Sequence, residues 1–365
     1  MKHHNAHRLR VCFYIPVTTS WWFTEIISNL IRTLASEHEV HAIVTPEWKG
    51  TGLNGSHMRL LEELNNVQWH IFNHPDHHQL RTDASGTGEV INFIRQINPD
   101  LTLCRSADIK TPAQFPGHVR YIMEGGAEPM IIGPRSVVLS PNLFDHGILP
   151  ELSSDQDQRL DDLANVIFDT ALNMPKLPPR SEVFEAAGLS PCAKTLVLPL
   201  EYQHEENFFR QHLDIEDNAQ LITQVVSRLP QDTQLLVTDH PLNVLHCDTS
   251  EVEKTLASLK GKAGMLREID ILAPPTLAAI HYSDAMVVQN SKSWTLCADL
   301  DKPLLRLSDF ATADWVNAYC DWPDFLNDLA HGELKRPDAV MARRWFAFRA
   351  ANDVFSPHRP GIHRF

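Results

Sequence analysis

Two strand-like runs in the carboxyl-terminal half of the chain end in polar residues that could hold an anion. The run 235–238 is followed by His240-Pro241, and the proline ends the strand because it fixes its own φ and removes a backbone donor. The run 285–288 leads through the polar segment 289–293 into a helical run. Ligands of open parallel sheets bind at the carboxyl edge, and helix amino termini favour anions. The residues predicted to hold a phosphate are therefore His240, Pro241, Asn290, Ser291, Lys292 and Ser293.

The same residues also have a structural interpretation, which the sequence leaves open. An imidazole placed after a strand can cap a loop, so His240 could be purely structural. Asn and Ser before a helix commonly cap it, which is the structural interpretation of Asn290 and Ser291. The position of His240 at a strand end favours a functional role for the imidazole.

An acidic residue follows a strand-like run in the amino-terminal half. The run 119–123 ends in Glu124, Gly125 and Gly126, and the two glycines would let another group approach the backbone closely. The carboxylate of Glu124 could act as a general base or as a nucleophile, or it could be a structural acid in an ion pair. The residues considered for binding a substrate carboxylate are Arg105 and Arg135.

The strand-like run 194–200 exits into an acidic segment that begins with Glu201 and contains Glu205. Because this exit also lies at a carboxyl edge, the two carboxylates could contact a nucleotide ribose or line a cleft. The structural alternative is a solvated strand exit, since connecting segments usually run over the surface.

Strand-like and helical runs alternate through both halves of the chain, which predicts parallel sheets. The first half opens with a strand at 10–15, a helix at 23–34 and a strand at 39–44, without the Gly-x-Gly-x-x-Gly of a dinucleotide site. The proline-rich segment 173–180 reads as a linker. The predicted domains are a Rossmann-like domain at 1–180 that carries Glu124, a Rossmann-like domain at 181–335 that carries the predicted phosphate-binding residues, and a C-terminal helix at 336–365 that packs back across them.

Composition excludes several classes of function. The formal net charge of −14 over 365 residues argues against a nucleic-acid binder, which normally shows a basic face. The six cysteines are scattered, and the chain contains neither HExxH nor Cys-x-x-Cys, so no metal site is expected. No apolar run reaches the ~20 residues that span a bilayer, and no signal-like segment opens the chain. The expected location is the cytoplasm, with peripheral association at the inner membrane as a further option.

Four motifs occur in an order that resembles the capsular polysaccharide biosynthesis family of Kdo (3-deoxy-octulosonic acid) transferases. They are Glu124-Gly125-Gly126, Pro199-Leu200-Glu201 with Glu205, His240-Pro241-Leu242-Asn243 and Asn290-Ser291-Lys292. The family pattern is roughly Glu-Asp-Gly, Pro-Leu-Gln with a later Asp, His-Pro-Leu and Asn-Ser-Thr. The departures from it are Gly125, Glu201, Glu205 and Lys292. The resemblance spans residues 119–310 and extends, more distantly, to bacterial CMP-sialic acid transferases.

The resemblance implies an α/β protein of the GT-B class, with two facing Rossmann-like domains and a cleft between them. It implies transfer of Kdo or a related acidic sugar from a CMP-activated donor to a surface polysaccharide or glycolipid acceptor, with retention of anomeric configuration. Glu124 and His240 would be the catalytic residues. No metal or other cofactor is expected, because CMP departs readily as a leaving group.

Two other functions remain open at this stage. A GT-B enzyme could use a UDP- or GDP-sugar, as a transferase or an epimerase. The departures Gly125 and Lys292 also suit a non-catalytic glycan-binding subunit of an assembly complex at the membrane. A nucleotide-sugar donor and a glycan or glycolipid acceptor are the expected small-molecule partners, and nucleic acid is not.

Overall fold

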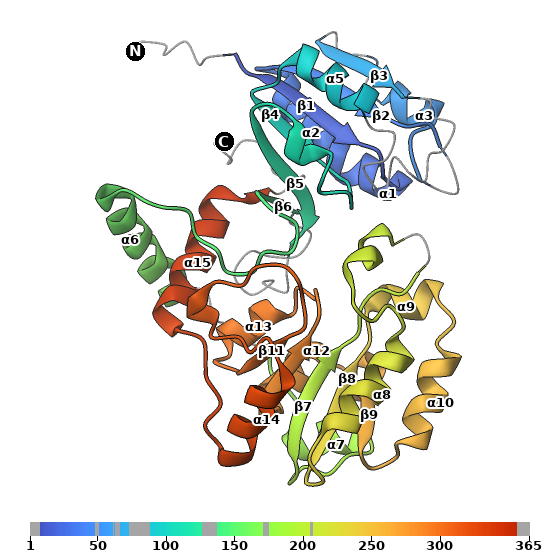
Figure 1. Ribbon diagram of the computed structural model, residues 1–365, viewed down its shortest axis with the longest axis vertical. Coiled ribbons are helices and arrows are strands. Elements are labelled where there is room, and N and C mark those ends of the chain that lie inside the picture. Colours follow the sequence, from blue (N-terminus) through green and yellow to red (C-terminus); the bar gives the residue numbers. More distant parts are fainter. Residues whose placement is uncertain are drawn as a thin grey trace. The chain divides into compact units, whose positions relative to one another are not determined.

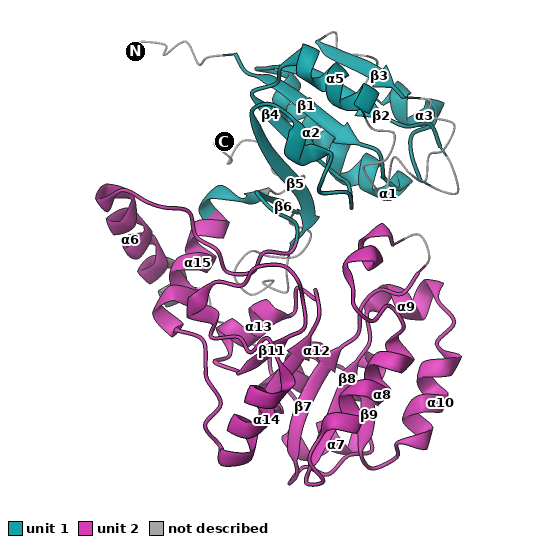
Figure 2. Ribbon diagram, in the orientation of Figure 1, with its two compact units in different colours: residues 1–125, 134–143, 351–365 teal, residues 126–133, 144–350 magenta. Residues whose placement is uncertain are grey.

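The chain folds into two compact α/β units, each built around its own sheet (Figures 1 and 2). The computed structural model describes residues 8–47, 51–60, 62, 66–72, 88–125, 137–170, 175–204 and 207–355. Unit 1 comprises residues 1–125, 134–143 and 351–365, and unit 2 comprises residues 126–133 and 144–350. The division therefore places residues 144–170 in unit 2, whereas the sequence prediction ran the first domain to residue 180.

The strands of unit 1 lie in the order β12-β6-β5-β4-β1-β2-β3. Strands β1 to β5 pair in parallel, and β6 runs antiparallel to β5. The strand bounds are β1 Arg10–Ile15, β2 Glu39–Val44, β3 Val67–Ile71, β4 Leu101–Cys104, β5 His118–Glu124, β6 Val137–Ser140 and β12 Val354–Phe355. The helices are α1 Ser20–Trp22, α2 Ser28–Ala35, α3 Gly55–Arg59 and α5 Gly88–Ile97, with a π-helical segment at Phe23–Ile27 and a 3-10 turn at Pro112–Gln114.

The predicted β-α-β start is confirmed, and its apolar pattern builds the core of unit 1. In β1 every residue after Arg10 is buried, because both faces of a parallel sheet are covered. The helical segment from α1 to α2 is continuous, and Thr19 accepts a hydrogen bond from the backbone N–H of Trp22 at 3.4 Å as its N-cap. The apolar residues of this segment that recur at helical spacing join the core: Ile26, Ile27, Leu30, Ile31 and Leu34.

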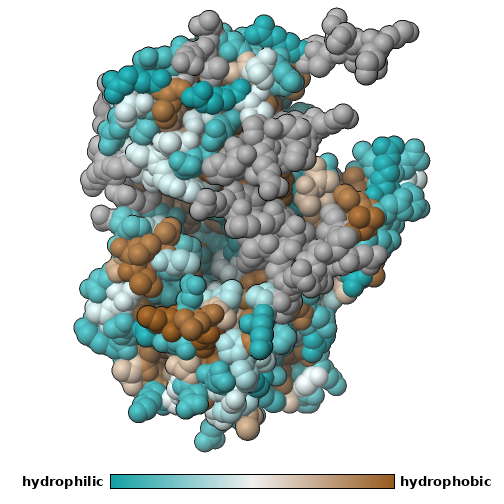
Figure 3. Space-filling model, turned by 180° about the vertical axis from the view of Figure 1, so that it is seen from behind, coloured by the Kyte–Doolittle hydropathy of each residue, from teal (hydrophilic) through white to brown (hydrophobic). Residues whose placement is uncertain are grey.

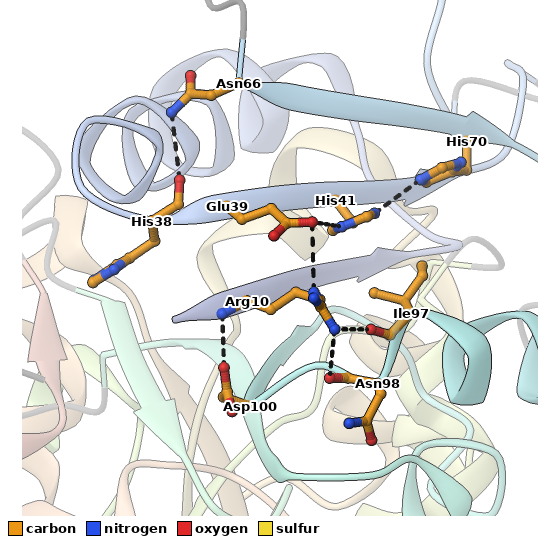
Figure 4. A network of polar contacts seen from close by, with 9 residues as sticks. All are labelled: Arg10, His38, Glu39, His41, Asn66, His70, Ile97, Asn98 and Asp100. Atoms are coloured by element: carbon orange, nitrogen blue, oxygen red, sulfur yellow. Dashed lines mark hydrogen bonds and ion pairs between the residues drawn. The ribbon is translucent and has the colours of Figure 1, made fainter. Parts of the chain in front are cut away.

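A polar network lies toward the amino-terminal ends of strands β1 and β2 (Figure 4). Arg10 Nε lies 3.5 Å from Glu39 Oε1, and the same oxygen lies 2.9 Å from His41 Nε2. His41 Nδ1 lies 3.2 Å from His70 Nε2 on the neighbouring strand β3. The hydrogen bond with His41, together with Arg10, holds the pKa of Glu39 below its usual value. Since the strands are parallel, this network stands at the edge opposite to the carboxyl ends.

The strands of unit 2 are all parallel and lie in the order β11-β10-β7-β8-β9. Their bounds are β7 Lys194–Pro199, β8 Thr233–Thr238, β9 Ala263–Leu266, β10 Ala285–Val288 and β11 Leu304–Arg306. The helices are α6 Ser154–Thr170, α7 Arg180–Ala186, α8 Asn218–Arg228, α9 Pro241–His246, α10 Ser250–Ser258, α11 Glu268–Ile271, α12 Pro275–Tyr282, α13 Trp294–Asp299, α14 Trp322–His331 and α15 Ala339–Asn352. Short 3-10 turns lie at Phe208–His212 and Asp314–Val316.

Both faces of the second sheet are covered, as alternation along its strands requires. In β8, Leu236 packs into one core cluster, whereas its neighbours Leu235 and Val237 pack into the other. The first cluster contains residues of α7, α12, α13 and α15, and the second contains residues of α8, α10 and α14. The α/β class with two largely parallel sheets, predicted from the sequence, is confirmed.

None of the helices in the described ranges is long and apolar enough to cross a membrane. Figure 3 shows hydrophobic patches set within a mainly hydrophilic rear face. In unit 2, helix α9 exposes Leu242, Val244 and Leu245, and α11 with the residue that follows it exposes Ile269 and Leu272. Because Thr238 of β8 is paired in register with Leu266 of β9, both helices leave the sheet at the same edge.

Candidate functional site

The carboxyl edge of the second sheet collects most of the residues that the sequence predicted for phosphate binding. Strand β7 is central, the chain proceeds from it to β8 and β9 on one side, and it then crosses to β10 and β11 on the other. The gap between β7 and β10 is thus a topological switch point, where ligands bind in open α/β sheets. The backbone N–H of Asn290, after β10, donates to Glu201 Oε1, after β7, at 2.9 Å.

His240 lies between the end of β8 and the start of α9, as the sequence predicted. Its Nδ1 accepts a hydrogen bond from the backbone N–H of Leu242 at 3.3 Å, so it is the N-cap of α9 and Pro241 is the first helical residue. The ring stacks on Tyr202, with centroids 5.3 Å apart at 26°. Because Nδ1 is an acceptor here, the neutral imidazole carries its proton on Nε2. In this tautomer Nε2–H is a hydrogen-bond donor.

Asn243, one turn into α9, ties together the loops that follow β7 and β8. Its Nδ2 donates to the backbone oxygen of Glu201 at 2.9 Å and to Asp239 Oδ1 at 2.8 Å, and its Oδ1 accepts from the backbone N–H of Gln203 at 2.9 Å. The residue is buried. Sequence reasoning assigned it no role, although an Asn inside a helical run was a signal, since Asn is a weak helix former.

Asn243→Ala should lower the free energy of unfolding by about 2–4 kcal/mol, because it removes four side-chain hydrogen bonds, the weakest of them from Cys247 Sγ at 3.5 Å. Urea denaturation followed by circular dichroism would measure the change. The matched control is Asn327→Ala, an exposed asparagine in α14, for which a change below about 0.5 kcal/mol is expected. Equal stability of the two variants would contradict the tie between the loops.

Asn290 is committed to structural contacts in this conformation. Its side chain is buried, Nδ2 donates to the backbone oxygen of His212 at 2.7 Å, and Oδ1 accepts from the hydroxyl of Ser308. It does not cap α13, since the N-cap position is Ser293 and no side chain there accepts a helix N–H. Asn290 thus has a structural role in this conformation, but as a link between loops and not as a helix cap.

The residues after Asn290 remain partly exposed at the same edge. The hydroxyl of Ser291 accepts from the backbone N–H of Ser293 at 3.3 Å. Lys292 lies close enough to Glu201 for its charge to lower the pKa of that carboxyl group. Ser291, Lys292 and Ser293 are therefore placed at the switch point, next to Glu201, as the sequence predicted for the strand end.

In unit 1 the structure pairs two predicted residues with each other. Arg105 Nη2 donates to Glu124 Oε1 at 2.8 Å, and Arg105 Nη1 donates to the backbone oxygen of Ile122 at 3.1 Å. The guanidinium lies 3.9 Å from the centroid of the Trp22 ring. Arg105 is buried, whereas the side chain of Glu124 is about half exposed at 49%. Glu124 is therefore in an ion pair and still faces solvent, and the contact between Trp22 and Arg105 was not anticipated from the sequence.

The remaining predicted residues have different outcomes. Gly125 follows β5 directly and is partly exposed. Gly126, Arg135 and Glu205 lie outside the described residues. A group of three or more His, Cys, Asp or Glu side chains able to hold a metal ion is not found in the ranges that the structure describes. The expectation that no cofactor is needed stays a prediction.

Comparison with known proteins gives similarity in fold. No protein-family model matches the chain, and no curated protein matches it. Solved structures with a similar fold include the beta Kdo 2,7 transferase of Thermosulfurimonas dismutans KpsC, at 12% identity and TM-score 0.45, covering 81% of this chain and 87% of that one. The beta Kdo 2,4 transferase of the same KpsC has 12% identity and TM-score 0.44, covering 94% and 92%.

A third structure with a similar fold is a putative UDP-N-acetylglucosamine 2-epimerase from Listeria monocytogenes. Its identity is 12% and its TM-score 0.32, with 97% of this chain and 93% of that one covered. The capsular Kdo transferases that the motifs resemble are thus among the proteins similar in fold to this chain, and so is an epimerase. At this level of identity the similarity concerns the fold alone.

Proposed function

We propose that this chain is a glycosyltransferase that moves Kdo or a related acidic sugar from a CMP-activated donor to a surface polysaccharide or glycolipid acceptor. The observation that carries the proposal is the placement of His240 at the switch point of unit 2, with Nδ1 used as a helix cap. In this tautomer Nε2 would carry the proton and donate to a ligand at this edge, where ligands of such sheets bind. The order of the four motifs supplies the donor class.

The donor phosphate would bind at the carboxyl edge of unit 2. His240 Nε2–H donates to a phosphate oxygen, and Lys292 adds a positive charge close by. The hydroxyls of Ser291 and Ser293 supply further polar contacts. When the bond between the anomeric carbon and the phosphate oxygen breaks, the electron pair leaves with CMP, and these groups stabilise the charge that develops on it.

The acceptor chemistry would use Glu124 of unit 1. If the carboxylate attacks the anomeric carbon, a glycosyl ester forms, and its displacement by the acceptor hydroxyl gives net retention. If the carboxylate instead takes the proton of the acceptor hydroxyl, a single displacement gives inversion. The resemblance favours retention, and the anomeric configuration of the product, read by NMR, distinguishes the two routes. Cytoplasmic location and peripheral association with a membrane assembly complex remain predictions.

His240→Asn provides the sharpest test of donor binding. Asparagine is a good N-cap, so the variant keeps the contact with Leu242 N–H and should unfold within about 0.5 kcal/mol of the unchanged protein. It lacks the Nε2–H donor, so the Kd for CMP in isothermal titration should rise about 10- to 100-fold, as expected for one charge-assisted hydrogen bond.

Two controls accompany this titration. His246→Asn changes an exposed histidine at the other end of α9 and should leave CMP affinity within about twofold. Titration of UDP and GDP distinguishes the alternatives, since an enzyme for UDP- or GDP-sugars would bind one of them and ignore CMP. Equal CMP affinity in His240→Asn and the unchanged protein would remove the imidazole from the donor site.

A further inference from the structure

The carboxylate of Glu201 occupies a position at the switch point where an anionic ligand would otherwise be expected. Glu201 follows the central strand β7 by two residues. Its carboxylate accepts hydrogen bonds from the backbone N–H groups of Asn290, at 2.9 Å, and of Ser291. Its backbone oxygen accepts from the side-chain amides of Asn218 and Asn243, both at 2.9 Å. Glu201 thus connects the loop after β7 to α8 and α9 through its backbone oxygen, and to the segment after β10 through its carboxylate.

These contacts change which groups can receive a phosphate. The first two N–H groups of the segment 290–293 are already bound to an anion that belongs to the protein. A phosphate at this edge would therefore contact the remaining groups of Ser293, Lys292 and His240. It would also lie next to the carboxylate of Glu201, and two like charges at close range in a partly buried site repel each other.

The charged and titratable residues around Glu201 can be named for each neighbouring segment. Lys292 follows β10, Asp239 and His240 follow β8, and Asp217 precedes α8. Burial raises the pKa of Glu201 to about 7, and the N–H groups of Asn290 and Ser291 together with the charge of Lys292 oppose this rise. Lys292 is thus the cation that supports the ionised form of Glu201.

We propose that Glu201 is a positioning residue that holds the segment 290–293 in place through its carboxylate, and that it takes up a proton when a phosphate binds beside it. The proton-uptake half rests on the proposed function, because a phosphate must bind at this edge. Such a phosphate takes over the charge of Lys292 and adds a negative charge of its own, so the neutral form of Glu201 becomes favoured. Neutral Glu201 keeps a carbonyl oxygen that can still accept from Asn290 N–H.

The sign of the pH dependence follows from linkage. Binding that takes up one proton is favoured while Glu201 is protonated and weakens as pH rises through the pKa of the free protein. Affinity should therefore be nearly constant at low pH and fall above about pH 7. A suitable probe is the methyl ester of CMP, because this phosphodiester keeps one negative charge across the range, whereas the phosphate of CMP titrates near pH 6.

The test compares Glu201→Gln with the unchanged protein and with Glu182→Gln, which alters an exposed glutamate of α7. Between pH 7 and 8.5 the affinity of the unchanged protein and of Glu182→Gln should fall roughly tenfold. Glu201→Gln should change by less than about twofold. Titration in buffers of different ionisation enthalpy should show proton uptake near pH 7.5 that is missing in Glu201→Gln. The same pH profile and the same uptake in Glu201→Gln would overturn the proton-uptake half.

A second measurement tests the positioning half without any nucleotide. Hydrogen–deuterium exchange of the free protein should be faster in Glu201→Ala, which removes the acceptor, than in Glu182→Ala for the peptide that contains the amides of Asn290 and Ser291. Unchanged exchange there would overturn the positioning half. If no cytidine nucleotide binds but exchange still rises, the proposed function and proton uptake both fail, and the positioning role stands.

Discussion

Glu124→Gln is expected to lower the rate of sugar transfer by about 10²- to 10⁴-fold, the usual range for loss of a catalytic acid or base. Glutamine keeps an oxygen at the position of Oε1, which accepts from Arg105 Nη2 at 2.8 Å in the structure. The contact between the two strands is therefore retained, while the negative charge and the nucleophilic oxygen are lost. The loss should appear in kcat measured by CMP release with a saturating donor.

CMP affinity separates this prediction from a general loss of structure. Glu124 belongs to unit 1, whereas His240 and Lys292 belong to unit 2, so Glu124→Gln should leave the Kd for CMP within about twofold. Glu89→Gln, at an exposed position of α5, is the matched control within unit 1 and should keep full activity. Undiminished transfer by Glu124→Gln would show that the carboxylate serves only as the partner of Arg105.

The sequence predicted the strands whose residues favour a strand by themselves. The predicted bounds of β2 and β10 agree with the structure, since apolar runs there are bounded by polar residues or turns. Strand β9, with the sequence Ala-Gly-Met-Leu, was missed, because none of these residues prefers a strand strongly. A Cβ on Gly264 would lie 2.0 Å from the backbone oxygen of Ala187. Glycine is therefore needed here for a close tertiary contact, which the sequence does not reveal.

Other misses had local signals. Helix α14 begins after the N-cap Asp321, has a proline in its first turn, and ends at Gly332 with φ 74°, which is the residue order typical of helix ends. Strand β6, Val137–Ser140, was not among the predicted strands. It has four residues and is the second strand from the edge of its sheet. A run this short gives little periodic signal in the sequence.

The candidate site divides in the same way. Strand ends identified Glu201, His240 and the segment 290–293, because parallel strands bring their carboxyl ends to one edge. The hydrogen-bond partners of the Asn290 side chain could not be predicted. Its partners His212 and Ser308 lie 78 and 18 residues away in the chain and meet it only in the folded protein.

Arg306→Met is expected to cost about 3–5 kcal/mol of unfolding free energy, because it removes several hydrogen bonds from a charged donor, each worth about 1.5–3 kcal/mol. Arg306 ends β11, and 2% of it is exposed. Its Nη1 donates to the backbone oxygens of Phe310 and Ala311, both at 2.9 Å, and its Nη2 donates to the backbone oxygen of Phe144. Burial lowers the pKa of Arg306 to about 10, so the group stays charged at neutral pH.

The loss should be large because methionine replaces the length of the side chain but none of its donors. The buried backbone oxygen of Phe144 and the partly buried one of Phe310 would lose the guanidinium as a donor, and a buried group costs about 1–3 kcal/mol when it is left unsatisfied. The backbone oxygen of Ala311 keeps its hydrogen bond from the N–H of His146. Arg306→Lys should lower the unfolding free energy by an intermediate amount, since one ammonium group cannot donate to as many acceptors as the planar guanidinium. Arg336→Met, which removes an exposed ion pair with Asp301, should cost about 1 kcal/mol or less.

The effect of Arg306→Met should also reach the candidate site. Arg306 Nη2 donates to the hydroxyl of Ser308 at 3.2 Å, and that hydroxyl donates to Asn290 Oδ1. Loosening this chain of contacts frees the segment that Glu201 holds, so amide exchange at residues 290–291 should increase at urea concentrations below the unfolding transition. Urea denaturation and exchange measured on the same samples would check both effects. If Arg306→Met unfolds within about 1 kcal/mol of the unchanged protein, the buried guanidinium does not hold these loops together.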